Sequence, residues 1–292
     1  MNDQETVSAQ SSRPPEAQPP PRRKFPWAML ILVGLFVIVP FLSWYGTWFG
    51  RALSDEKLDE YFRAGARPRD VQHALSQIAA GMSNGDQSVK RWYPAIIEAA
   101  GREAPAVRLT AAWAMGNDNG HEEFHPVLLR LLGDSHPGVR HNAALSLVRF
   151  NDARARPELL AMLESRRLRA ESPGTVEFIV KEEGAAVAEG APLVRIKDDA
   201  GRTVELRAPE AARIEALVVS DGARVESGQE VMVLAPDVEQ LWEALRALFI
   251  VGQPEEISLI DRYTRPIPGV PDRVRQQAVS TIEAIRTRQA GR

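Results

Sequence analysis

The segment 105-PAVRLTAAWAM-115 returns 32 residues later as 137-PGVRHNAALSL-147. Both copies begin with proline, continue with a Val-Arg pair and carry two adjacent alanines in the next turn. Proline is favoured in the first turn of a helix, and small alanines allow helices to approach one another closely. A period of this length is typical of one helix pair in a solenoid. We therefore predict a stack of antiparallel helix pairs around this segment.

Helical spacing of apolar residues extends through residues 50–168, in short stretches broken at Gly and Pro. The apolar stretches cover residues 58–62, 71–78, 89–99, 107–115, 124–132, 139–148 and 159–163. A looser copy of the repeat, 271-PDRVR-275 followed by Ala278 and Val279, belongs to a second helical region at residues 238–290. The sequence thus predicts helical repeats on both sides of a different middle segment.

The helical copies resemble HEAT repeats of the short, phycobilisome-lyase-like kind. The shared features are the proline, the Val-Arg pair, the paired alanines and the leucine-rich helix that follows, at residues 105–132 and 137–163. The resemblance implies an α-solenoid whose concave surface binds another protein, and it implies binding more than catalysis.

Two sets of side chains on the predicted helices are expected to be structural. The arginine of the Val-Arg pair recurs in each copy, and we expect it to pair with acids of neighbouring repeats. These arginines are Arg108, Arg140 and Arg275. Three tryptophans fall on apolar faces of predicted helices, and we expect them in the core. They are Trp92, Trp113 and Trp242.

Between the helical regions, residues 171–236 change to a period of two, with glycines at short intervals. This segment contains an internal repeat with a constant offset of 38 residues. The matched positions run from Val176 to Ile196 in the first copy and from Ile214 to Leu234 in the second. Each glycine among the matched positions of the first copy is aligned with a glycine in the second. We predict two quasi-equivalent halves that share one core.

The repeated β segment resembles the biotinyl/lipoyl domain, a flattened β-barrel of two intertwined halves that also occurs in membrane-fusion adaptors. Carrier domains place a modified lysine on the hairpin between the halves. Here that slot falls on or near Gly201, and Lys197, at the start of the hairpin, has no flanking methionine. Adaptors insert a long helical hairpin at the same place, for which residues 198–205 leave no room. We expect a rigid module, inserted in the solenoid, that is available for protein contacts.

The N-terminal part differs from the rest in composition. Residues 1–24 are polar and proline-rich, which predicts a disordered tail. Residues 25–49 carry no charge and are long enough to cross a hydrocarbon layer of about 30 Å, with Trp27 and Trp44 near the two ends. Basic residues 22–24 at the near flank favour an internal N-terminus. We predict a single-pass protein of the inner membrane, with its C-terminal domains in the periplasm.

Composition excludes several classes of chemistry. The chain of 292 residues has a formal net charge of -3 and no cysteine. The charge gives no reason to expect nucleic acid as a partner. The absence of cysteine excludes disulfides, thiol nucleophiles and thiolate zinc sites, and it agrees with folded domains outside the cytoplasm. The sequence also lacks a phosphate-binding glycine loop, a nucleophile elbow and a dinucleotide fingerprint.

One motif matches a catalytic pattern. His121, Glu122 and His125 have the spacing of a zinc protease, in which two histidines one helical turn apart bind the metal and the glutamate activates water. The mechanism requires all three on one helix. Residues 117–120 are Asn-Asp-Asn-Gly, and Pro126 follows, so we interpret the match as a turn and a helix start.

The sequence as a whole predicts a multidomain α plus β protein: one transmembrane helix and a HEAT-like solenoid with an inserted lipoyl-like domain. We expect a membrane-anchored, non-enzymatic scaffold or adaptor for other proteins of an envelope complex. We expect no catalytic, cofactor-binding or metal-binding residues, no cofactor and no small-molecule substrate. Two alternatives stay open: a divergent membrane-fusion-type subunit of an efflux or secretion system, and a zinc hydrolase that uses His121, Glu122 and His125.

Overall fold

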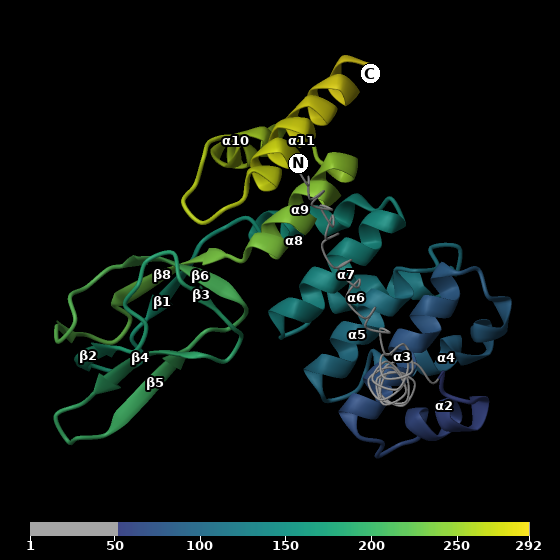
Figure 1. The fold of residues 1–292 in the computed structure, drawn as a ribbon, viewed down its shortest axis with the longest axis horizontal. Coiled ribbons are helices and arrows are strands. Elements are labelled where there is room, and N and C mark those ends of the chain that lie inside the picture. The colour runs from purple at the N-terminus through teal and green to yellow at the C-terminus, as the bar shows by residue number, and fades with distance from the viewer. Residues whose placement is uncertain (1–51, 292) are drawn as a thin grey trace, which may run out of the picture. The chain divides into compact units, whose positions relative to one another are not determined.

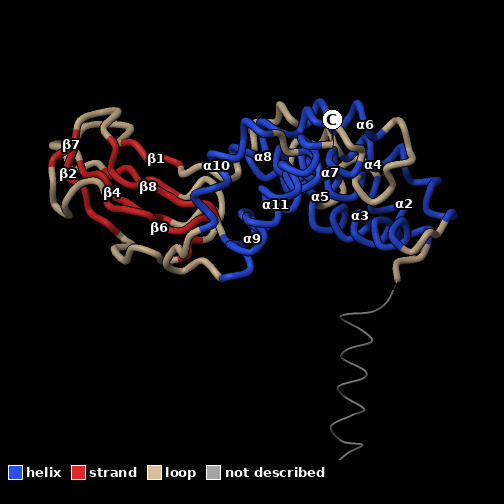
Figure 2. The backbone as a smooth tube through the Cα atoms, turned by 90° about the horizontal axis from the view of Figure 1, so that it is seen from above, coloured by secondary structure: helices blue, strands red, loops and turns tan. Residues whose placement is uncertain are grey.

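A computed structural model describes residues 52–291 (Figure 1). The predicted disordered tail, residues 1–24, and the predicted membrane segment, residues 25–49, lie outside the described residues. Two kinds of structure make up the described part: helices in two rows, and a set of eight strands between α8 and α9. Helices that precede and follow the strands in the sequence lie together (Figure 2).

Five helices pack side by side in chain order and form what we call the first row. They are α3 (Pro68–Ser83), α5 (Pro105–Met115), α7 (Pro137–Arg149), α9 (Val238–Val251) and α11 (Asp272–Ala290). The first three have proline in their first turn, as the repeat predicts. The close approach of α5 and α7 brings the buried hydroxyl of Ser146 within 2.8 Å of the Ala112 carbonyl, to which it donates a hydrogen bond.

The remaining helices are shorter and form the second row, which packs against the first. They are α2 (Asp55–Phe62), η1 (Gln87–Trp92), α4 (Tyr93–Ala99), α6 (Phe124–Leu131), η2 (Ala153–Ala155), α8 (Arg156–Ala161), η3 (Pro254–Glu256), α10 (Ile257–Asp261) and η4 (Arg262–Thr264). Several of these helices have an N-cap residue whose side chain accepts a hydrogen bond from a free N–H group of the first turn. Asp152, for example, accepts from the N–H group of Arg154 at the start of η2.

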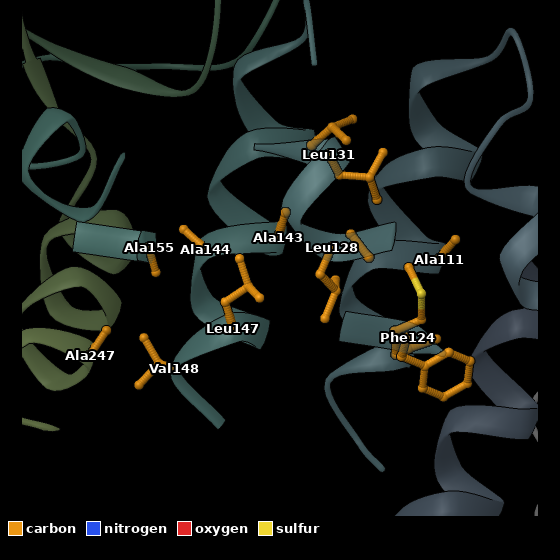
Figure 3. Close-up of a cluster of buried hydrophobic side chains, with 14 of the residues drawn as sticks. Ala111, Phe124, Leu128, Leu131, Ala143, Ala144, Leu147, Val148, Ala155 and Ala247 are labelled. Carbon is orange, nitrogen blue, oxygen red and sulfur yellow. The ribbon is translucent and has the colours of Figure 1, made fainter. Parts of the chain in front are cut away.

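The two helical regions share one hydrophobic core. Its buried side chains come from residues 58–163 and again from residues 241–285. Figure 3 shows part of this core, where Phe124 of α6, Leu147 of α7 and Ala247 of α9 belong to the same cluster. The α9–α11 segment therefore continues the packing that α7 and α8 begin.

The eight strands, which we call the β unit, form two four-stranded antiparallel sheets with a separate core. The strands are β1 (Arg166–Arg169), β2 (Gly174–Phe178), β3 (Ala186–Val187), β4 (Pro192–Lys197), β5 (Thr203–Arg207), β6 (Ala212–Leu217), β7 (Arg224–Val225) and β8 (Glu230–Pro236). The sheet orders are β1-β8-β6-β3 and β5-β4-β2-β7. The two sheets share no strand, so the predicted flattened barrel is corrected to two separate sheets that bury their apolar faces in one core.

The predicted 38-residue repeat is confirmed by the pairing of the strands. A shift of 38 residues places β2 on β6, β3 on β7 and β4 on β8, and it converts one sheet order into the other. Val176 pairs with Ile196 in one sheet, and Ile214 pairs with Leu234 in the other. Each half also lends its short strand, β3 or β7, to the sheet of the other half. The halves are therefore intertwined.

Two glycines hold the equivalent crossings in place. The N–H of Gly184 donates to Ile214 O at 2.7 Å, and the N–H of Gly222 donates to Val176 O at 2.8 Å. Both glycines have a positive φ, +86° and +80°, which side-chain-bearing residues rarely adopt. The repeated glycines thus follow from the repeated turn.

The structure corrects the predicted fold class and localisation. Across residues 52–291 we find no helix with both the length and the apolar composition needed to span a bilayer. The longest described helix, α11, has 19 residues but carries charged side chains along its length. The transmembrane helix and the single-pass, inner-membrane placement are therefore not retained.

The shared core predicts a contrast between two neighbouring leucines of α7. Leu147 is fully buried, whereas Leu145 is only partly buried. Leu147→Ala should lower the free energy of unfolding by about 2–5 kcal/mol, because it leaves a cavity between helices. Leu145→Ala, the matched control, should lower it by at most about 1 kcal/mol. Urea unfolding followed by tryptophan fluorescence measures both values, and equal losses would contradict the assigned packing.

Candidate functional site

The repeated arginines are tied into the fold. Arg108 makes a two-pronged bond to Asp134, with Nε 2.7 Å from Oδ2. Arg140 repeats the pattern one helix pair later, with Nε 3.2 Å from Oε1 of Glu158. Arg275 instead pairs with Asp272 of its own helix, at 3.2 Å. Arg108 thus binds an acid beyond its own repeat copy, as predicted, whereas Arg140 and Arg275 bind acids of their own copies, so for these two the prediction is wrong. The guanidinium groups of Arg108 and Arg140 are consequently occupied.

The structure separates the three residues of the zinc-protease motif. Helix α6 begins at Phe124, so His121 and Glu122 precede it and only His125 lies within it. The His121 ring packs against the rings of Tyr93 and Phe124, at centroid distances of 4.8 and 4.6 Å. Across residues 52–291, no group of three or more His, Cys, Asp or Glu side chains is placed to hold a metal ion. The local geometry matches the predicted turn and helix start.

His125 is engaged by a carboxylate of the next turn. Its Nε2 lies 2.7 Å from Oδ2 of Asp152. The same carboxylate accepts from the N–H and guanidinium groups of Arg154. The hydrogen bonds from Arg154, together with that from His125, hold the pKa of Asp152 far below its ordinary value. His125 thus helps to hold the turn between α7 and α8.

The first row leaves apolar side chains in contact with solvent on α5 and α7. Trp113 is 42% exposed, so the expectation that it lies in the core is wrong, while Trp92 is buried as expected. Leu145 occupies the position of Trp113 one repeat later and is also partly exposed. Leu109 continues the strip one turn before Trp113. We call Leu109, Trp113 and Leu145 the apolar strip.

A groove lies beside this strip, where α5, α7 and the start of α9 meet the β unit. It has a volume of about 300 Å³, and Leu109, Leu145 and Met162 provide its apolar wall. Five carboxylates line it, and none of its described lining residues is Lys or Arg. They are Glu189, Glu210, Asp237, Glu239 and Glu243. We call this feature the acidic groove.

His141 lies in the wall of the acidic groove and is uncharged at neutral pH. Burial, aided by Arg140 and Arg166, lowers the pKa of His141 to about 4. The two carboxylates beside it, Glu158 at 3.3 Å and Glu210 at 3.5 Å, are themselves paired with those arginines. Burial also raises the pKa of Glu210 above its ordinary value. His141 therefore brings no imidazolium charge to offset the carboxylates of the groove at neutral pH.

Comparison with known proteins bears on the helical part. A family model described as HEAT repeats matches residues 70–172. The match supports a HEAT-like helical region at these residues, which we call the HEAT-repeat region. The match ends before α9 and α11, although those helices share its core. The HEAT-repeat region contains the whole apolar strip and the α7 side of the acidic groove.

Other comparisons add little. No curated protein matches the chain. A solved structure titled "Structure and function of a single-chain, multi-domain long-chain acyl-coa carboxylase" is similar at 27% identity, with a TM-score of 0.23. The similarity covers 40% of this chain and 12% of that one. This chain therefore matches only a small fraction of that protein's length.

The environment of Asp152 in the HEAT-repeat region predicts a pH-dependent stability. The pKa of Asp152 is lowered in the folded state, so the carboxylate stabilises the fold above the unfolded pKa of about 4 and loses this effect as the pH falls. Asp152→Asn should lower the free energy of unfolding at pH 7 by about 1–3 kcal/mol, through lost charge-assisted hydrogen bonds. The gap between wild type and variant should narrow below about pH 4.

Urea unfolding measured from pH 7 down to pH 2.5 checks this expectation. The matched control is Asp199→Asn, which removes an exposed ion pair with Arg224 and should change stability little. A gap for Asp152→Asn that stays constant over the whole pH range would show that its charge is not what stabilises the turn.

Proposed function

We propose that this protein is a non-enzymatic scaffold that binds a segment of another protein along the apolar strip and the acidic groove. The observation that carries the proposal is Trp113, a large aromatic side chain that a repeat helix leaves 42% exposed. Tryptophan is the residue type most enriched among those that dominate binding energy at protein interfaces. Leu145 and Leu109 extend its apolar surface, and the match to HEAT repeats agrees with a role in protein binding.

The chemistry of the two surfaces defines the partner segment. An apolar side chain of the partner would cover Trp113, and a lysine or arginine would enter the acidic groove. Five carboxylates line the groove beside a neutral His141. Three of them, Glu210, Glu239 and Glu243, pair with arginines that lie outside the lining. A basic side chain of the partner would be attracted to the carboxylates of the groove, whereas an acidic one would be repelled by them.

Within this proposal, the β unit has a structural role. Its intertwined halves resemble those of biotinyl/lipoyl carrier domains, but a carrier function is not part of the proposal. Lys197 pairs with Thr203 inside the β4–β5 hairpin, and Asp198 and Arg202 close the turn with an ion pair of 2.7 Å. The tip of the β4–β5 hairpin is therefore a turn with charged side chains, and it presents no lysine of the kind that carrier domains modify. The β unit instead contributes Glu189 and Glu210 to the lining of the acidic groove.

Site-specific photo-crosslinking in cells tests the proposal. Benzoylphenylalanine in place of Trp113 should capture a partner, and the captured segment should contain Lys or Arg beside an apolar residue. The control places the same group at Arg130, which is exposed on α6 in the second row. Equal capture of the same partner from both positions would contradict a specific face.

The captured segment, made as a peptide, then allows the affinity to be measured with purified full-length protein. Trp113→Ala should weaken binding at least about tenfold, because it removes the central anchor. Glu243→Gln should weaken it by about threefold and reduce its salt dependence, whereas Glu226→Gln, an exposed acid outside the groove, should not. Binding of Trp113→Ala within twofold of wild type would overturn the proposal.

A further inference from the structure

Arg213 is a buried arginine on β6 whose charge has no ion pair in the described part of the chain. Only 7% of its surface is exposed. Its Nη1 donates a hydrogen bond to Pro268 O at 3.1 Å. Its Nε is buried and has no hydrogen-bond partner among residues 52–291. A donor of this kind is costly to leave unpaired, and a buried charge more so.

Two other arginines of low exposure are paired with carboxylates, whereas Arg102 and Arg288 are held by backbone carbonyl groups. Arg108 binds Asp134, and Arg156 binds both Glu255 and Glu256. Arg213 is more buried than either of them, yet a carbonyl group is its hydrogen-bond partner. Its deeper burial and its unpartnered Nε indicate that its guanidinium group has hydrogen-bonding capacity left for an oxyanion.

The side chain of Arg213 lines a cavity of about 580 Å³ between the β unit and the segment from η4 to α11. This volume lies in the range of small-molecule pockets, which run from about 300 to 1,000 Å³. A second guanidinium, that of Arg262, lines the same cavity. Its Nη2 is held by Leu163 O and by the hydroxyl of Tyr263, so the group is fixed in orientation. Two fixed guanidinium groups thus face one cavity.

Two carboxylates, Glu183 and Glu215, also line the cavity. With Arg213 and Arg262 they bring the charge of the lining close to balance. A polyanion such as nucleic acid would meet these acids and gain little. A small molecule with one oxyanion group, placed at the arginines, avoids them. The two carboxylates therefore favour a small ligand with a single anionic group over a polyanion.

The arrangement is specific to one half of the β unit. The residue equivalent to Arg213 in the first half, 38 positions earlier, is Thr175, which is exposed. The pairing of β6 with β8 shifts between Ile214 and Ala216, a β-bulge at Glu215, whereas β2 and β4 pair without a shift. Bulges re-aim side chains and are frequent beside binding sites. The bulge places Glu215 in the lining of this cavity beside Arg213.

We propose that this cavity binds a small molecule through a carboxylate or phosphate group, which accepts hydrogen bonds from the guanidinium groups of Arg213 and Arg262. A guanidinium group offers donors in a planar fork that matches either oxyanion. The proposal is independent of the protein-binding face, which uses residues of α5, α7 and α9 together with Glu189 and Glu210 of the β unit, none of which lines this cavity.

Thermal unfolding of the full-length protein with acetate or inorganic phosphate tests this site, with chloride matched for ionic strength. An anion at tenfold its dissociation constant should raise the unfolding midpoint by about 2–5 °C. Arg213→Met should abolish the shift, and Arg262→Met should reduce it. Arg207→Met, which changes an exposed arginine of β5, should retain it. A response to only one of the two probes assigns the site to carboxylates or to phosphates.

A second measurement keeps the test decisive should Arg213→Met fail to fold. The arginine Nε–H signals of the wild-type protein, recorded by NMR, should include one that shifts on addition of the active anion and is unchanged by chloride. In Arg262→Met, that signal should need about tenfold more anion for the same shift, whereas in Arg207→Met it should shift as in the wild type. The proposal is overturned if neither anion moves the midpoint or an Nε–H signal beyond the chloride control. An equal midpoint shift in folded Arg213→Met would overturn it as well.

Discussion

The close approach of neighbouring first-row helices is the constraint on which the rest of the structure depends. Ala111, Ala112, Ala143 and Ala144 are all fully buried, and a side chain added at Gly116 would come within 2.5 Å of the Ser146 hydroxyl. Small residues are required at this distance because larger ones would force the helices apart. The same contact recurs after the β unit, where the Thr281 hydroxyl donates to Leu245 O at 2.9 Å. One packing rule therefore joins helices that the β unit separates in the sequence.

Because the helical core continues across the insertion, the β unit needs a core of its own and fixed connections at both ends. Its buried residues form a separate cluster. The hydroxyl of Tyr263, from the second helical region, donates to Leu163 O just before β1, at 2.5 Å. His136 of the HEAT-repeat region meets Glu189 of the β unit at 2.9 Å. These contacts create the junctions where the acidic groove and the Arg213 cavity lie.

The helical repeat and the 38-residue repeat could be predicted from the sequence, because each repeats a local pattern of proline, alanine or glycine that has a direct steric cause. The environment of single residues could not. Trp113 lies among apolar residues on its helix, and only the packing of neighbouring helices decides that its face stays uncovered. The burial of Arg213 depends on Pro268, which is distant in the sequence. The predicted membrane helix rested on composition alone, and no described helix supports it.

Comparison of the two halves of the β unit shows which positions carry charged residues that the repeat itself does not require. Three charged residues of the β unit meet the helical region: Glu189 at His136, Glu210 at His141, and Arg213 at Pro268. Their equivalents, 38 positions away, are Ser227, Ser172 and Thr175. All three equivalents are small hydroxyl residues that are exposed or partly exposed. The two halves thus keep the same glycines and apolar positions, which the shared core requires, and differ in charge where one of them faces the helices. A purely structural insertion would need no such difference, which is why we locate both proposed binding sites at these junctions.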